Sequence, residues 1–223
     1  MITLLGVSHV HGLGPRIDLE MERRRPDLIA LELDPGRLQA LRYPHRVRQT
    51  PGVYGLLAAF QRRIAGEYGA DVGEEMLAAY TAGNRLGIPV ALIDLDSRRI
   101  RRELWTSLRP WELLKLLFSA LGSLFVGREQ IEQELHRYQE DYAGFMEALA
   151  RDYPAVKEVL VDRRNSHMAE ELKRLQGAYE RVVAVVGDGH VLGLSSLLEG
   201  EDLEVVRLWE LREPEAKSGH DDT

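Results

Sequence analysis

The chain contains one unbroken apolar run, Val182-Val183-Ala184-Val185-Val186, which is followed directly by Gly187-Asp188-Gly189-His190. A short apolar run rich in β-branched residues predicts a strand covered on both faces, as in a sheet sandwiched between helices. We therefore predict a central parallel or mixed sheet of about five strands. The other four segments of this character are Ile2–Gly6, Leu28–Leu33, Val90–Asp94 and Leu203–Leu208.

Segments of helical length and period separate these strands, so the alternation predicts an α/β fold in which helices flank the sheet. The gap between the third and fourth strands, about 96–180, is nearly all helical, and we expect it to form an excursion that covers one end of the sheet. We predict a single domain, 1–212, and a polar, disordered tail, 213–223. The predicted helices are Gly14–Arg25, Pro35–Leu41, Val53–Ala65, Gly73–Leu86, Pro110–Leu121, Arg128–Arg151, Ala155–Gln176 and Leu192–Leu198.

The composition excludes several classes of function. The 223 residues carry a formal net charge of -7, which argues against a nucleic-acid partner. No cysteine is present, so disulfides, thiolate metal sites and a cysteine nucleophile are excluded. Any metal would therefore bind His, Asp, Glu or backbone oxygen. The N-terminus shows no signal-peptide pattern, and we expect a cytoplasmic protein.

The apolar stretch Leu104–Val126 contains Arg109, Glu112 and Lys115, and these charges argue against a transmembrane segment. It has the pattern of an amphipathic helix instead. We expect its apolar face to pack on the core, with a homo-oligomer interface through 105–125 and a membrane-surface contact as the alternatives. That face consists of Trp111, Leu114, Leu117, Phe118 and Leu121.

Polar residues follow the predicted strands where ligands bind in open α/β sheets, at the carboxyl ends. The first strand ends in Gly6-Val7-Ser8-His9 and the fourth in Gly187-Asp188-Gly189-His190, while Glu32 lies in the otherwise apolar second strand. Two histidines and a carboxylate are a common ligand set for a catalytic divalent metal, so His9, Glu32 and His190 are candidate ligands. Such an ion activates water for hydrolysis. The alternative is that each histidine is a helix cap or a satisfied polar core residue.

Arg164 lies four residues from both Leu160 and Met168, in the middle of the apolar stripe of the predicted helix Ala155–Gln176. An unpaired buried charge is very unfavourable, so Arg164 requires an anion. Either it forms a structural salt bridge, or it faces the site and stabilises negative charge on substrate or transition state. Helical geometry points Asn165 away from the centre of the stripe.

Together these residues resemble the TraB family, which is grouped with the pheromone-shutdown proteins and the Tiki proteases, and the resemblance covers nearly the whole chain. The motif His9-Val10-His11 alone also resembles amidohydrolase barrels, but these need eight strand–helix units. The segments that carry the TraB resemblance are Leu5-Gly6-Val7-Ser8-His9-Val10, Ile29-Ala30-Leu31-Glu32-Leu33-Asp34 with Arg37, Gly73-Glu74-Glu75-Met76, Gly87-Ile88-Pro89-Val90-Ala91-Leu92-Ile93-Asp94, Arg164-Asn165-Ser166-His167 and Val185-Val186-Gly187-Asp188-Gly189-His190.

The resemblance implies a core with two GxxH motifs and, in the Tiki branch, a metalloprotease that uses manganese or cobalt; zinc is a further candidate. His9 and His190 match the motif histidines, and Glu32 matches the glutamate after the second strand. By the same motifs, Glu75, Arg164 and Asn165 are candidate catalytic residues. The chain departs from the family signature where Arg163 replaces a glutamate and where Leu95-Asp96 replaces Arg-Asp.

Two functions follow as hypotheses. The first is a metal-dependent hydrolase, peptidase-like, in which Glu32 or Glu75 is either a ligand or the general base and Arg164 stabilises an oxyanion. The second is a non-catalytic protein of the pheromone-shutdown type that binds a peptide or small ligand in the same pocket.

Overall fold

The computed structural model describes residues 1–7, 14–43, 73–112, 114–115 and 142–207. Five strands form one sheet in the order β3-β2-β4-β1-β5, and every pairing is parallel, so the predicted α/β class is confirmed. Each strand coincides with one of the predicted apolar segments. Their bounds are β1 Ile2–Val7, β2 Leu28–Leu31, β3 Val90–Leu92, β4 Val182–Gly187 and β5 Leu203–Val206.

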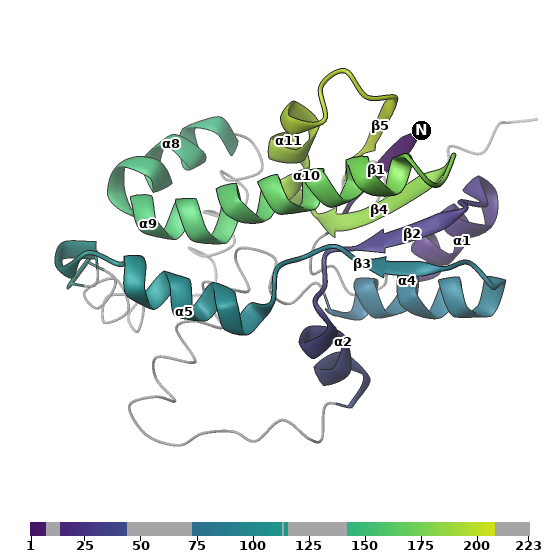
Figure 1. Cartoon of the computed structure of the whole chain (residues 1–223), viewed down its shortest axis with the longest axis horizontal. Helices are drawn as coiled ribbons and strands as arrows, with labels where there is room; N and C mark the ends of the chain where they lie inside the picture. The colour runs from purple at the N-terminus through teal and green to yellow at the C-terminus, as the bar shows by residue number, and fades with distance from the viewer. Residues whose placement is uncertain (8–13, 44–72, 113, 116–141, 208–223) are drawn as a thin grey trace, which may run out of the picture.

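Helices cover both faces of the sheet (Figure 1). On one face, α1 (Gly14–Arg24) and α4 (Gly73–Leu86) pack on alternate strand residues such as Leu5 and Leu31. On the other, α10 (Arg163–Gln176) and α11 (Asp188–Leu197) pack on the intervening residues. The chain moves from β1 through β2 to β3 across the first face and returns through β4 to β5 across the second, as right-handed crossovers require.

The connections that leave the neighbouring strands β1 and β4 run to opposite faces of the sheet. Ligands of open α/β sheets bind where strand connections diverge in this way, at the carboxyl ends. Val7 pairs with Gly187 at the end of these strands, so both glycine-and-histidine motifs begin at this point. The helices α2 (Pro35–Arg42) and α11 begin at the same end, directly after their strands.

The predicted excursion between the third and fourth strands is helical in its described parts and lies beyond the carboxyl ends of the strands (Figure 1). It contains α5 (Ser97–Ser107), α8 (Tyr142–Asp152), α9 (Pro154–Lys157) and a π-helical turn (Glu158–Asp162) before α10. These elements form a small core of their own around Leu149, Val156 and Val161.

Three of the predicted helices differ in detail from the observed elements or are only partly described. The predicted helix Ala155–Gln176 is helical throughout, but it includes a π-helical turn between α9 and α10. The predicted helix Leu192–Leu198 begins earlier, at Asp188, because Gly187 serves as its N-cap directly at the end of β4. The predicted helix 128–151 is described only from Tyr142, where α8 begins, and the predicted helix 53–65 lies outside the described residues.

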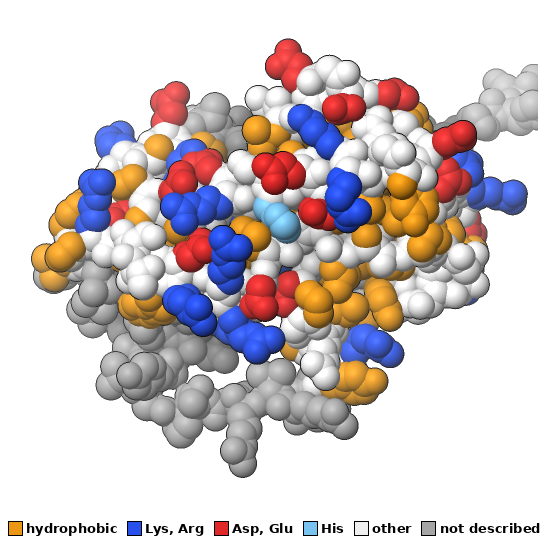
Figure 2. Space-filling view, viewed as in Figure 1, with side chains coloured by type: hydrophobic (Ala, Val, Ile, Leu, Met, Phe, Trp, Pro, Cys, Tyr) orange, Lys and Arg blue, Asp and Glu red, His pale blue; other side chains and the backbone are white. Residues whose placement is uncertain are grey.

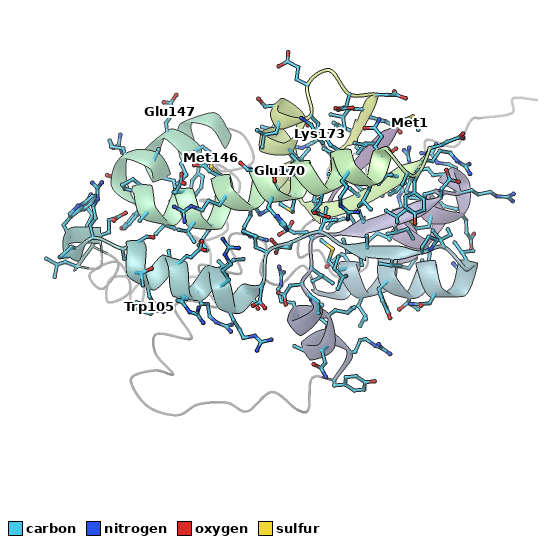
Figure 3. All side chains as sticks on the ribbon, in the orientation of Figure 1. Met1, Trp105, Met146, Glu147, Glu170 and Lys173 are labelled. Atoms are coloured by element: carbon cyan, nitrogen blue, oxygen red, sulfur yellow. The ribbon has the colours of Figure 1, made fainter. Side chains whose placement is uncertain are left out.

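The core-packing prediction for the apolar face of the 110–121 segment is wrong for its two described members, because Trp111 is 39% and Leu114 is 55% exposed. Lys115 lies over the Trp111 ring, 5.1 Å from its centroid. Trp105, on α5, also projects away from the sheet into solvent (Figure 3). Within the described ranges, no helix is both long and apolar enough to span a bilayer.

Candidate functional site

Glu32 occupies the position just after β2 and is completely buried. Its backbone N–H continues the sheet by donating to Val185 O at 3.1 Å. Because Leu31 and Leu33 pack toward α1 and α4, alternation turns the Glu32 side chain toward α10 and α11. There its Oε2 accepts the Gly187 N–H at 2.6 Å, and its Oε1 accepts a hydrogen bond from Arg164 Nη2. Both carboxylate oxygens therefore have defined partners.

Arg164 lies in the first turn of α10 and is buried beneath the helix, whose outer side carries exposed Glu170 and Lys173 (Figure 3). Besides the Glu32 contact, its guanidinium donates through Nε and Nη2 to the two oxygens of Asp94, at 3.0 and 2.9 Å. Nη1 donates to Leu160 O at 3.3 Å, inside the π-helical turn. The anion that the sequence required for Arg164 is thus supplied within the protein by two carboxylates.

The balance of burial and charge favours the ionised forms of Arg164 and Asp94. Burial alone would lower the pKa of Arg164, but Glu32 and Asp94 outweigh it and raise that pKa. Burial would likewise raise the pKa of Asp94, but the Arg164 guanidinium, with Arg37, holds that pKa below its ordinary value. The carboxylate and the guanidinium each stabilise the charged form of the other.

Asp94 and Arg37 are members of the cluster that were not selected as site residues from the sequence. Arg37, in the first turn of α2, donates through Nη1 to Asp94 Oδ2 at 3.0 Å and to Glu32 O at 3.3 Å. Asp34 fixes that turn by accepting the N–H groups of Gly36 and Arg37. The available signal was Asp94 itself, a carboxylate at the end of an apolar strand in the same position as Glu32.

His190 lies in the first turn of α11 and is 3% exposed. Its Nδ1 is 2.6 Å from Asn165 Oδ1, and its Nε2 is 3.4 Å from Glu32 Oε1. Burial lowers the pKa of His190, with partial opposition from Glu32, so the ring is neutral at pH 7. Since the Asn165 oxygen can only accept, Nδ1 carries the proton and Nε2 presents a lone pair toward the Glu32 carboxylate.

Asn165 is 4% exposed, although helical geometry places it away from the centre of the apolar stripe of α10. It is buried because α11 packs along α10 and covers a second strip of its surface. Gly193 permits this contact, because a Cβ at that position would collide with the Asn165 amide nitrogen. At the end of β1, Gly6 has the same role: a Cβ there would be 2.5 Å from Asp188 Oδ1 and 2.8 Å from Val191 Cγ2.

The remaining candidates are placed only in part. Glu75 is buried in the first turn of α4. Because α4 runs back toward the start of β3, its first turn lies at the carboxyl-end side of the sheet. His9 lies outside the described residues. The structure thus brings Glu32, Arg164, Asn165 and His190 together, adds Asp94 and Arg37, and does not describe the position of the first motif histidine.

The carboxyl-end cluster, which we define as Glu32, Arg37, Asp94, Arg164, Asn165 and His190, combines two carboxylates, two guanidinium groups and a neutral imidazole. The described residues contain no group of three or more His, Asp or Glu side chains arranged to hold a metal. They do contain one carboxylate–imidazole pair, Glu32 and His190, which is chemically suited to a divalent ion. Around the site, acidic and basic side chains are interspersed over the surface in view (Figure 2).

Comparisons with known proteins agree with this arrangement of motifs. The model of the TraB/PrgY/gumN family matches residues 1–205. An uncharacterized protein of Methanocaldococcus jannaschii is 31% identical over 160 residues, which make up 70% of this chain and 40% of that protein. The chain therefore spans about two fifths of the length of that relative.

Proposed function

The chain belongs to the TraB/PrgY/gumN family, and we propose that it is a divalent-metal-dependent hydrolase, peptidase-like, with its site in the carboxyl-end cluster. One observation carries the proposal. His190 Nε2, which carries no proton in this tautomer, and Glu32 Oε1, which accepts from Arg164, face each other at 3.4 Å in a buried site. Two acceptors held together without a proton between them favour a cation as their common partner.

The residues fit such an ion in spacing and in chemistry. Ligand bonds of about 2.1 Å in a tetrahedral arrangement place two donor atoms about 3.4 Å apart, which matches the separation of Nε2 and Oε1. Imidazole with carboxylate suits manganese, cobalt and zinc. His9 would be the third ligand by its motif. A bound ion would supply a Lewis acid that polarises a substrate carbonyl and acidifies water.

The other residues of the cluster hold this pair in place. Asn165 fixes the tautomer and the plane of His190 through Nδ1, a support that metal-binding histidines usually receive. Gly187 N–H and Arg164 orient the two oxygens of Glu32. We assign Arg164 this positioning role because its Nε–Nη2 edge is already occupied by Asp94. Glu75 is the candidate general base.

A second candidate function is a non-catalytic protein that binds a peptide or small ligand, of the pheromone-shutdown type. The observation that favours it is the presence of only two suitably placed metal-binding side chains among the described residues. In this case the cluster would shape a polar pocket, and no added ion would produce turnover.

Metal analysis of protein purified without an affinity tag tests the proposal. The wild type should bind manganese, cobalt or zinc, and His190→Ala, His9→Ala and Glu32→Gln should each lose that binding. His167→Ala is the matched control, because His167 lies on α10 and is only partly buried. Equally little metal in wild type and His190→Ala would reject the metal site.

Substrate screening separates the two functions. Peptides and esters are incubated with the protein and each of the three ions. Hydrolysis that is abolished in His190→Ala supports the enzyme and excludes the binding-only function. Ligand binding that persists while no ion gives turnover supports the second candidate.

A further inference from the structure

Two arginines share Asp94, but they use their nitrogens differently. Arg164 places its Nε–Nη2 edge against both oxygens of Asp94, at 3.0 and 2.9 Å. Arg37 uses only Nη1, which donates to Asp94 Oδ2 at 3.0 Å and to Glu32 O at 3.3 Å. Within the described part of the chain, the Nε and Nη2 atoms of Arg37 have no hydrogen-bond acceptor.

The unused edge of Arg37 has the geometry of a carboxylate receptor. The Nε–H and Nη2–H groups of a guanidinium form a planar fork that binds both oxygens of a carboxylate. Arg164 shows this arrangement with Asp94. The Arg37 side chain is 21% exposed, against 9% for Arg164, so an incoming ligand can reach it. Its Nη1 contacts fix the plane of the guanidinium before a ligand arrives, which reduces the entropy lost on binding.

The position of Arg37 places its guanidinium group next to the backbone of Glu32, one of the two proposed metal ligands. Arg37 follows Glu32 by five residues, in the first turn of α2 at the carboxyl end of β2. A ligand held by Arg37 would therefore approach the Glu32–His190 pair.

We propose that the Nε–Nη2 edge of Arg37 binds a carboxylate of the ligand, so that the site takes peptides or small molecules with a free carboxylate close to the reacting group. This inference rests on the proposed function for the location of the ligand. In this proposal Arg37 recognises the charge of the ligand. The sequence alone had suggested Arg164 for that contact. The contacts of Arg164 with Asp94 and Glu32 leave that residue the role of positioning the site.

The inference is tested by comparing the affinities of the protein for tri-alanine and for tri-alanine amide. Calorimetry measures both affinities directly, so the test does not depend on catalytic turnover. The wild type should bind the free acid about tenfold more tightly than the amide, as expected for a charge-assisted pair. Arg37→Gln should bind both peptides equally, and Arg37→Lys should keep part of the preference because the ammonium retains charge but not the planar fork. Arg85→Gln should behave as wild type, because Arg85 pairs with Glu22 near the C-terminal end of α4, at the opposite end of the sheet.

A second measurement covers the case in which Arg37→Gln fails to fold. Titration of the wild type with tri-alanine should shift the Arg37 Nε–Hε NMR signal, which Arg37→Lys identifies by removing it, and should leave the Arg164 signal unchanged. Equal binding of acid and amide by the wild type, binding of neither, or a preference retained in Arg37→Gln would overturn the inference. Loss of metal binding with the peptide preference intact would instead reject the metal-dependent function alone.

Discussion

The two ends of the sheet carry charge in different ways. At the amino ends, Asp27 and Arg181 precede β2 and β4 and pair at the surface, with side chains 34% and 50% exposed. The N-terminal amine and Asp202 pair there as well, also in solvent. At the carboxyl ends, Glu32, Asp94 and Arg164 form their ion pairs almost completely removed from water.

The difference in exposure indicates two roles for charged side chains: those at the amino ends serve solubility, and those at the carboxyl ends shape a site. Exposed pairs are screened by water and salt and contribute little to stability. Buried ions lose their hydration, and replacing them with well-packed apolar residues is often neutral or stabilising. The carboxyl-end cluster contains five ionisable side chains and one amide at the ligand-binding end of the fold. Because burying such charges brings little net stability, a functional role explains the cluster better than a stabilising role.

Removing the buried arginine should have the largest effect. Arg164→Met leaves the carboxylates of Glu32 and Asp94 without their main partner, and we expect a loss of about 3–5 kcal/mol in the free energy of unfolding. Arg181→Met, at the amino ends, should produce a far smaller loss. Denaturant titration of both variants measures the contrast, and equal losses would contradict the distinction between the two ends.

A glycine-to-alanine substitution that affects Asn165, in the first turn of α10, should have a larger effect than one at the far end of that helix. Gly193→Ala drives a methyl group into the Asn165 amide, and overpacking of this kind costs about 1–3 kcal/mol. The displaced amide should also weaken metal binding about tenfold, because His190 loses its orienting partner.

The matched control for Gly193→Ala is Gly177→Ala, at the other end of α10. Gly177 has a φ of -64°, and a Cβ there would meet its nearest neighbour at 3.4 Å, so alanine is tolerated. Thermal unfolding and metal titration give the two readouts. Metal affinity that is the same in both variants would show that Asn165 does not act on His190.

A smaller effect concerns acid stability. The folded state lowers the pKa of Asp94 below its ordinary value of 3.8, so the ionised side chain contributes stability that is fully present above about pH 4 and is lost as the pH falls through the lowered pKa. The contribution is on the order of 1 kcal/mol for each unit by which the pKa is lowered.

Asp94→Asn removes that contribution. The difference in unfolding free energy between wild type and Asp94→Asn should therefore narrow as the pH decreases below about 4. Denaturation at a series of pH values from 7 to 2.5 measures it. A difference that stays constant over this range would show that Asp94 is not held ionised by Arg164.

The sequence predicted the sheet because several of its strands are nearly continuous apolar runs, and this pattern is visible within each segment alone. The sequence also identified Arg164 as a buried charge that requires an anion, because it lies in an apolar stripe, and it singled out Glu32 as a carboxylate within an apolar strand. Asp94 and Arg37 were not selected, although Asp94 follows an apolar strand as Glu32 does, because the sequence alone does not show that either residue has a buried partner. Only the pairing of β2 with β3 and the approach of α10 bring their charges together.

Asn165 and His190 show what the sequence of a single helix cannot reveal. A helical wheel of one segment cannot reveal that α11 packs along α10 and buries a second strip, so the burial of Asn165 could not be predicted from it. His190 was expected to precede a helix that begins at Leu192, whereas the helix begins directly after β4, at Asp188, and includes His190. The partnership of these two residues follows from packing between helices far apart in sequence.

The central claim is that His190 presents an unprotonated Nε2 to Glu32 as half of a divalent-metal site. Nitrogen-15 NMR of the His190 ring at pH 7, with and without zinc, tests it most directly. We predict a neutral ring with the proton on Nδ1, and an Nε2 signal that shifts when zinc is added while Nδ1–H persists. A ring protonated on Nε2, or an Nε2 signal that zinc leaves unchanged, would contradict the account.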